Sequence, residues 1–227
     1  MKTAIVINGL PRVYKSTCEA FGEMLNGADA DVYIFAWDSD VNQLADHYNA
    51  TRVETEPYED YRQGILDKCP LIRECSNLKF GFSIETGLFA QYLSLQKAFN
   101  LIPDPDQYDL IMRVRFDWKP RFKIDWPSMN LDDDVISSPI QKMPGLKNSV
   151  FRMNDLFVCG KPSAFKFYAN FNDHILDEEL RDFMKAHNCI VPEFMLSKHL
   201  MDNGLRIEPR YWPYDLFNRG AKWRTYP

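Results

Sequence analysis

The chain alternates short apolar runs, typical of buried strands, with longer stretches whose apolar residues recur at helical spacing. We predict strands at residues 3–7, 31–36, 51–54, 108–117, 134–138, 149–159 and 205–208. Helices are predicted from Ser16 onward and at residues 84–101, 162–172, 175–187 and 192–202. Ser16 and Glu19 match a reciprocal helix cap. The pattern predicts a single α/β domain with a mostly parallel central sheet flanked by helices.

Residues 108–117 (Tyr-Asp-Leu-Ile-Met-Arg-Val-Arg-Phe-Asp) are the most informative segment. Their apolar residues predict a buried strand, and Arg113, Arg115 and Asp117 alternate on its other face. Open α/β sheets bind ligands at the carboxyl ends of their strands, where Arg115 and Asp117 would lie. Arginine binds phosphate through paired charged hydrogen bonds, and a carboxylate can hold a divalent cation. The segment therefore indicates a nucleotide diphosphate site, with a structural ion-pair cluster as the alternative.

Two further candidate pairs follow the first two predicted strands. Gly9 permits close backbone approach and Arg12 could reach a phosphate, although an ordinary strand-to-helix turn explains both equally well. Trp37 could stack on a base and Asp38 could bind a ribose hydroxyl. The alternative for this pair is a core tryptophan and a helix-capping aspartate. The chain has neither a dinucleotide-binding glycine motif nor a P-loop motif.

The second half of the chain supplies two candidate catalytic acids. Asp155 follows Asn154 inside an otherwise apolar run, where a polar group is costly unless it is paired or used. We expect Asp155 to bind a sugar hydroxyl or to act as a base, and an exposed edge position is the alternative. Glu193 opens the predicted helix 192–202, where helix-dipole stabilisation explains an acid equally well.

Composition narrows the class of protein. Of the 227 residues, 45% are apolar and 26% charged, as in folded globular proteins, and no window has the apolar length of a membrane span. We therefore expect a cytoplasmic protein without a transmembrane segment. The formal net charge of −5 argues against a protein devoted to nucleic acid. A basic, aromatic tail at residues 210–224 keeps DNA open as a partner.

These motifs together resemble the small glycosyltransferase-like proteins of GT-A fold found in bacterial polysaccharide clusters and in viruses. The resemblance covers most of residues 3–200 and rests on the strand-end glycine and arginine, the run Phe-Ala-Trp-Asp, Gln91-Tyr92, residues 108–117 and Asn154-Asp155-Leu156-Phe157. It implies a nucleotide-diphosphate sugar as donor, such as a UDP-sugar, and a divalent cation, Mn²⁺ or Mg²⁺. It implies a Rossmann-like nucleotide-sugar half at about residues 1–118 and an acceptor half at about 119–227.

The resemblance also assigns roles to particular residues. Asp117 matches the last acid of the DxD-type motif that binds the metal, whereas Arg115 replaces the first acid. Gly9, Arg12 and Asp38 match the nucleotide pocket, which we expect to include Trp37, Gln91, Arg113 and Arg115. Asp155 matches the acceptor-side carboxylate.

We therefore expect glycosyl transfer to an acceptor hydroxyl. Arg12, Arg115 and a metal on Asp117 would hold the diphosphate, and Asp155, or as second choice Glu193, would accept the proton. A glycan acceptor is favoured over a modified DNA base, and retention or inversion at the sugar is open. A non-catalytic sugar-binding module and a nucleotidyltransferase are the alternative functions.

Overall fold

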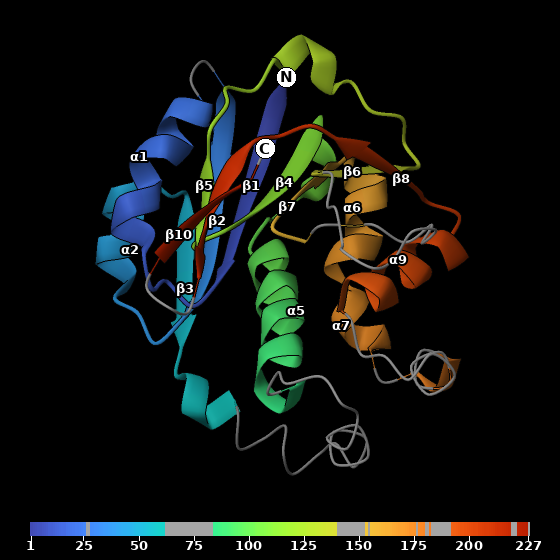
Figure 1. Cartoon of the computed structure of the whole chain (residues 1–227), viewed down its shortest axis with the longest axis horizontal. Helices are drawn as coiled ribbons and strands as arrows, with labels where there is room; N and C mark the ends of the chain where they lie inside the picture. The colour runs from blue at the N-terminus through green and yellow to red at the C-terminus, as the bar shows by residue number, and fades with distance from the viewer. Residues whose placement is uncertain are drawn as a thin grey trace.

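The computed structural model describes residues 1–25, 28–61, 84–139, 153, 155–175, 177–179, 182, 192–218 and 222–226. A seven-stranded sheet lies at the centre, in the order β3-β2-β1-β4-β7-β6-β8 (Figure 1). Its strands are β1 (Lys2–Gly9), β2 (Asp29–Trp37), β3 (Arg52–Glu56), β4 (Leu110–Arg115), β6 (Val135–Pro139), β7 (Phe157–Gly160) and β8 (Arg206–Arg210). All neighbours pair in parallel except β7, which is antiparallel to β4 and β6. The predicted single α/β domain with a mostly parallel sheet is confirmed.

Helices cover both faces of this sheet (Figure 1). On one face lie α1 (Tyr14–Met24) and α2 (Val41–Tyr48). The other face carries α5 (Ile84–Asn100), α6 (Pro162–Ala169), α7 (Phe171–His174) and α9 (Pro192–Asp202). Two short 3₁₀ turns, η1 (Pro105–Gln107) and η2 (Trp126–Met129), lie in the connections. The sheet therefore separates two hydrophobic cores.

Strand β4 contributes side chains to both cores. Leu110, Met112 and Val114 belong to the core beneath α1 and α2, and Ile111 to the core beneath α5. Because helices cover both faces, the side of β4 that carries Arg113 is not open to solvent, and Arg113 is fully buried. The side chains of β4 alternate between the two faces of the sheet, as expected. The face that carries Arg113 points into the core beneath α5 and is not exposed.

Helix α1 starts earlier than its capping pattern predicts. It begins at Tyr14, and the predicted cap at Ser16 is wrong. Ser16 lies inside the first turn, where its Oγ donates a 2.8 Å hydrogen bond to the Val13 carbonyl. Helix α2 does have a side-chain cap, because Asp40 accepts from the backbone N–H groups of Asn42 and Gln43. The helix predicted at 175–187 lies mostly outside the described residues, as does the first part of the strand predicted at 149–159.

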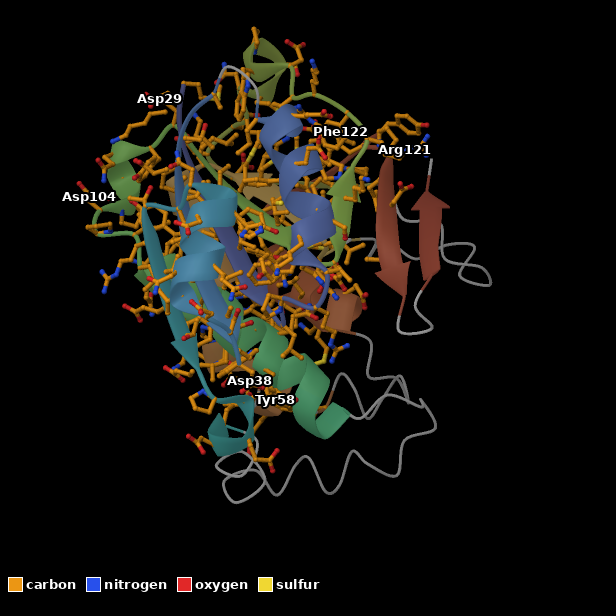
Figure 2. The ribbon with its side chains drawn as sticks, turned by 90° about the vertical axis from the view of Figure 1, so that its left-hand side faces the viewer. Asp29, Asp38, Tyr58, Asp104, Arg121 and Phe122 are labelled. Atoms are coloured by element: carbon orange, nitrogen blue, oxygen red, sulfur yellow. The ribbon has the colours of Figure 1, made fainter. Side chains whose placement is uncertain are left out.

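A small second sheet, in the order β10-β9-β5, packs on the α1 side. It consists of β5 (Trp118–Pro120), β9 (Tyr214–Asn218) and β10 (Lys222–Tyr226). Trp118 stacks on Phe157 with ring centroids 4.9 Å apart, and Trp212 meets the same ring at 4.6 Å. Figure 2 shows Arg121 and Phe122 beside these strands, well away from Asp38 and Tyr58. In the tail, Trp212 and Tyr214 therefore pack against the domain, whereas Tyr211 is 65% exposed.

Phe157 is the aromatic contact on which the two sheets most depend, because it is fully buried between Trp118 and Trp212. We predict that Phe157→Ala lowers the free energy of unfolding by about 3–5 kcal/mol, the usual cost of removing a buried phenylalanine. Urea unfolding measures it. Phe167→Ala on α6 is the control, because that ring is 42% exposed and its loss should cost less than about 0.5 kcal/mol. Equal costs for the two variants would contradict the proposed role of Phe157.

Candidate functional site

The carboxyl ends of β1 and β4 form the topological switch point of the sheet. The chain leaves β1 for β2 and β3 on one side and later returns with β4 on the other side. Asn8 of β1 is in register with Phe35 of β2 and with Arg115 of β4. Connections that diverge at such a point leave a crevice outside the strand ends, where open α/β sheets bind ligands. Arg115 and Asp117 thus lie where the sequence places them, at the carboxyl end of β4 and just beyond it.

Arg115 and Asp117 form a two-pronged ion pair. Nε of Arg115 donates to Oδ1 of Asp117 at 2.9 Å, and Nη2 donates to Oδ2 at 2.7 Å. Both side chains are about one quarter exposed, at 27% and 26%. Burial lowers the pKa of Arg115, but the carboxylates of Asp117 and Asp155 outweigh it and raise the pKa above its ordinary value. Arg115 is therefore a permanent cation at the rim of the crevice.

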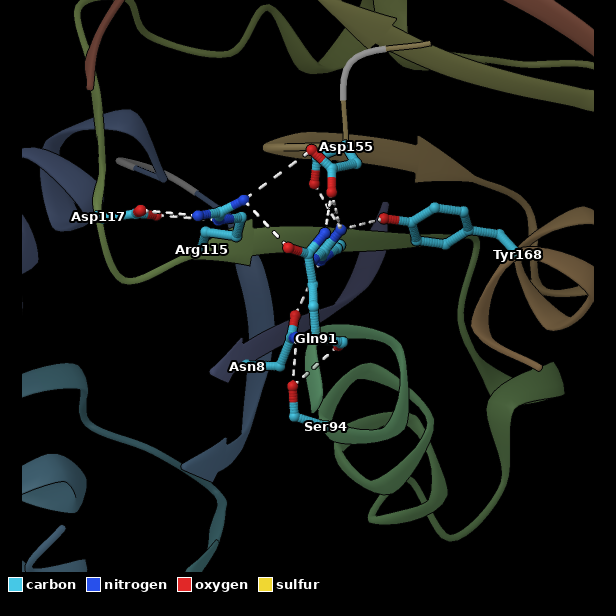
Figure 3. A network of polar contacts seen from close by, with 8 residues as sticks. Asn8, Gln91, Ser94, Arg115, Asp117, Asp155 and Tyr168 are labelled. Carbon is cyan, nitrogen blue, oxygen red and sulfur yellow. Dashed lines mark hydrogen bonds and ion pairs between the residues drawn. The ribbon is translucent and has the colours of Figure 1, made fainter. Parts of the chain in front are cut away.

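Gln91 of α5 connects Arg115 to Asp155 (Figure 3). Its side-chain oxygen accepts from Nη1 of Arg115 at 3.3 Å, and its amide nitrogen donates to the Asp155 carboxylate. Asp155 lies just before β7, is 4% exposed and approaches Nη1 of Arg115 to 4.0 Å. The structure therefore brings together three candidates that lie far apart in the sequence.

Arg113 lies behind this cluster, with no exposed surface. Its Nε donates to Oδ1 of Asn8 at 2.8 Å, and its Nη1 donates to the Tyr168 hydroxyl at 2.6 Å and to the Asp155 carbonyl. The Asp155 carboxylate lies 3.6 Å from Nη1. Among the described residues, Nη2 finds no hydrogen-bond partner. Arg113 therefore ties β4 to β1, to α6 and to the residue that precedes β7.

Three residues of this network are absent from the sequence-based candidates: Asn8, Ser94 and Tyr168. Asn8 is 2% exposed and donates through Nδ2 to Oγ of Ser94 at 2.9 Å and to the Gln91 carbonyl at 3.0 Å. The only signal for Asn8 is an amide at the end of an apolar strand. Ser94 and Tyr168 are fully buried within helices, and their sequence context does not separate them from core residues.

Glu193 borders the same cluster from the first turn of α9. Burial, followed by the nearby Asp155 carboxylate, raises its pKa from 4.5 to about 7, although Arg115 offsets part of the rise. An acid at a helix start has a structural explanation in the helix dipole. Glu193 in addition changes charge near neutral pH and lies near the Arg115 cation. Such a carboxyl group is suited to exchange a proton with a ligand.

The remaining candidates lie outside this network. Gly9 adopts a positive φ of 115°, which favours glycine, and the Arg12 side chain is exposed just beyond it. Trp37 is 1% exposed and stacks on Tyr61 with centroids 4.9 Å apart, which matches the core alternative. Asp38 is exposed, and its carboxylate accepts from the Tyr58 backbone N–H at 2.8 Å. None of these four contacts the Arg115 cluster through a hydrogen bond or ion pair that the described residues show.

The described carboxylates do not fit a divalent cation. Mg²⁺ and similar hard cations take about six oxygen ligands, with several from carboxylates and water. No three His, Cys, Asp or Glu side chains group together in the described part of the chain. Both oxygens of Asp117 already accept from Arg115.

We predict that Arg113→Met destabilises the fold by about 3–5 kcal/mol, because it removes one partner of a buried, hydrogen-bonded ion pair. Urea unfolding followed by circular dichroism measures this cost. Arg52→Met is the control: Arg52 pairs with Glu54 at 2.7 Å on strand β3, but both are about half exposed. Its loss should cost less than about 1 kcal/mol. Comparable costs would show that Arg113 does not organise the interior.

Glu193 also predicts a pH-dependent stability. Because its pKa is raised on folding from 4.5 to about 7, the native state binds the proton more tightly than the unfolded state. The free energy of unfolding therefore falls as pH rises from 4.5 to about 7, and the penalty is complete above that range. Glu193→Gln cannot ionise, so its stability relative to wild type should be about 3 kcal/mol greater at pH 8 than at pH 4.5. A difference that does not change with pH would contradict the raised pKa.

None of the described helices is long and apolar enough to cross a membrane. No family model matches the sequence, and no curated protein is significantly similar to it.

Solved structures share the fold. Mouse xyloside xylosyltransferase 1, in its apo form, aligns over 92% of this chain and 84% of its own, with a TM-score of 0.53 and 9% identity. The galactosyltransferase LgtC, in complex with donor and acceptor sugar analogues, aligns over 91% and 73%, with a TM-score of 0.50 and 12% identity. Core-mannan synthase A of Aspergillus fumigatus, in a Mn/GDP form, aligns over 94% and 74%, with a TM-score of 0.55 and 14% identity. The chain therefore has a GT-A-like fold, as its motifs predict.

Proposed function

We propose that this protein is a glycosyltransferase that moves a sugar from a nucleoside-diphosphate sugar to an acceptor hydroxyl. The observation that carries the proposal is the cation Arg115 at the switch point of a GT-A-like sheet, next to an acid, Glu193, whose pKa is about 7. Solved proteins of this fold include one holding donor and acceptor sugar analogues and one holding GDP. The nucleotide-sugar side would use residues 1–118, and the acceptor side residues 119–227.

The reaction needs positive charge at the leaving group. A bond forms between the acceptor oxygen and the sugar's anomeric carbon, the bond from that carbon to the diphosphate breaks, and the electron pair leaves with the diphosphate. Groups preorganised where charge develops contribute most to such a step. Arg115 is held by Asp117 and Gln91 before any ligand arrives. Arg12, exposed beyond the tight turn at Gly9, would supply a second cation.

Glu193 is the better candidate for the group that accepts the acceptor's proton. A general base works best when its pKa lies near the operating pH, and the pKa of Glu193 is about 7. The Asp155 carboxylate accepts from the Gln91 amide, faces Arg113 and Arg115, and has almost no exposed surface. These contacts support a positioning role for Asp155, in contrast to the sequence-based expectation that Asp155 is the base.

A glycan is the acceptor that the chain favours. The formal net charge of −5 opposes binding to the polyanionic surface of DNA. Two of the solved structures with this fold are named for the transfer of single sugars, xylose and galactose. UDP-sugars, which the resemblance implies, and GDP-sugars, because one solved structure of this fold holds GDP, are the first donors to test.

The test measures release of nucleoside diphosphate from a panel of UDP-, GDP- and ADP-sugars, with water or simple glycans as acceptor. We predict release from at least one donor, at a rate that rises with pH through about 7 as Glu193 ionises. In Glu193→Gln this pH dependence should disappear and turnover should fall about 100-fold or more, whereas the donor dissociation constant should change little.

Other outcomes separate the alternatives. Donor binding without release of nucleoside diphosphate from any donor would indicate a sugar-binding module. Release of pyrophosphate would indicate nucleotidyl transfer. A wild-type pH profile in Glu193→Gln would show that Glu193 does not accept the proton.

A further inference from the structure

We infer that Arg115 itself, and no divalent cation, neutralises the donor diphosphate, and that Asp117 is a positioning residue for Arg115. The inference rests on the proposed function and goes beyond it, because it gives Arg115 and Asp117 roles that differ from metal binding. Three observations carry it: the hydrogen bonds of Asp117, the charge balance of the cluster, and the free donors of Arg115.

The first observation is that both oxygens of Asp117 are already engaged by Arg115. Both of its carboxylate oxygens accept from Arg115, at 2.9 and 2.7 Å. A metal ion on Asp117 would have to displace the guanidinium or share the oxygens with it. Either arrangement places a doubly charged cation beside the Arg115 cation in a partly buried crevice, where like charges repel strongly.

The second observation is that the cluster is electrically balanced without a metal. Arg113 and Arg115 carry two positive charges, and Asp117 and Asp155 carry two negative charges, so their sum is zero. A site that holds a divalent cation before the nucleotide binds needs an excess of anionic oxygen from the protein itself. Glu193 adds a negative charge mainly above pH 7, because burial and Asp155 raise its pKa to about 7.

The third observation is that Arg115 keeps donors for a ligand. Its hydrogen bonds to Asp117 and Gln91 use one N–H each on Nε, Nη1 and Nη2. A guanidinium has five N–H donors, so among the hydrogen bonds of the described residues one donor remains on each terminal nitrogen. With 27% of the side chain exposed, these donors can meet two phosphate oxygens in the paired geometry that arginine favours. Asp117 on one side and Gln91 on the other fix the guanidinium plane in advance.

Isothermal titration of the full chain with UDP and with GDP, in EDTA and in MnCl₂, tests the inference. We expect one of them to bind in EDTA, with an affinity within about threefold of that in MnCl₂. Arg115→Gln should weaken binding about 30-fold, the loss expected for charged hydrogen bonds to phosphate. Asp117→Asn should weaken it at most about fivefold in both buffers, because the asparagine oxygen still accepts from Arg115.

Arg52→Gln is the matched control, because Arg52 and Glu54 form a second ion pair two residues apart on a strand. It should leave binding unchanged. Circular dichroism establishes that each variant is folded. If Arg115→Gln does not fold, the comparison of buffers with the wild type and with Asp117→Asn decides the question.

Two results would contradict the inference, and they can be distinguished from each other. If wild-type protein binds the nucleotide only with MnCl₂, and Asp117→Asn loses that dependence, Asp117 is a metal ligand and the inference is wrong although the proposed function stands. If neither nucleotide nor any nucleotide sugar binds in either buffer, the proposed function fails and the inference fails with it.

Discussion

The buried charge of Arg113 is the constraint on which the rest of the site depends. A guanidinium without exposed surface is costly unless the protein balances its charge and accepts from its donors. Asp155 balances the charge, and Asn8, Tyr168 and the Asp155 carbonyl accept from Nε and Nη1, from β1, from α6 and from the segment just before β7. Each contact joins residues at least 42 positions apart in the sequence. The charge therefore fixes how three distant segments meet at one point.

The contacts of Arg113 continue outward to Arg115 at the strand end. Arg113 holds the backbone and faces the carboxylate of Asp155, Asp155 accepts from Gln91, and Gln91 accepts from Arg115. Asn8 anchors the α5 backbone through the Gln91 carbonyl and the Ser94 hydroxyl. Arg115, at the partly exposed end of the network, is thus supported by the fully buried Arg113 at the other end. Such support keeps a cationic group in one orientation, which is what charge stabilisation in a reaction requires.

The local pattern of apolar and polar residues predicts the helices and strands. The site depends on contacts between residues far apart in the sequence, which the local pattern does not predict. The apolar runs reveal β1, β2 and β4 because those strands are buried on both faces, and Arg115 and Asp117 follow from their place at a strand end. The partnership of Asn8 with Arg113 spans 105 positions and depends on how β1 and β4 align. The sequence around Trp37 does not show whether its ring is exposed to a ligand or buried in the core. Its stacking on Tyr61 shows that the ring is buried. The Ser16 cap fails because a hydroxyl in the first turn can equally bond the carbonyl three residues earlier.

The reversed direction of β7 has a consequence for how such a protein can change. In an all-parallel sheet, the residues that precede a strand lie at the rim opposite the ligand. Because β7 runs against β4, Asp155 just before it reaches the rim where β4 ends at Arg115. This edge of the sheet is therefore formed by the last residue of β4 and by the residues just before β7. Substitutions at Asp155 or Leu156 can therefore change this edge of the sheet while the parallel strands that carry Asn8 and Arg115 keep their register.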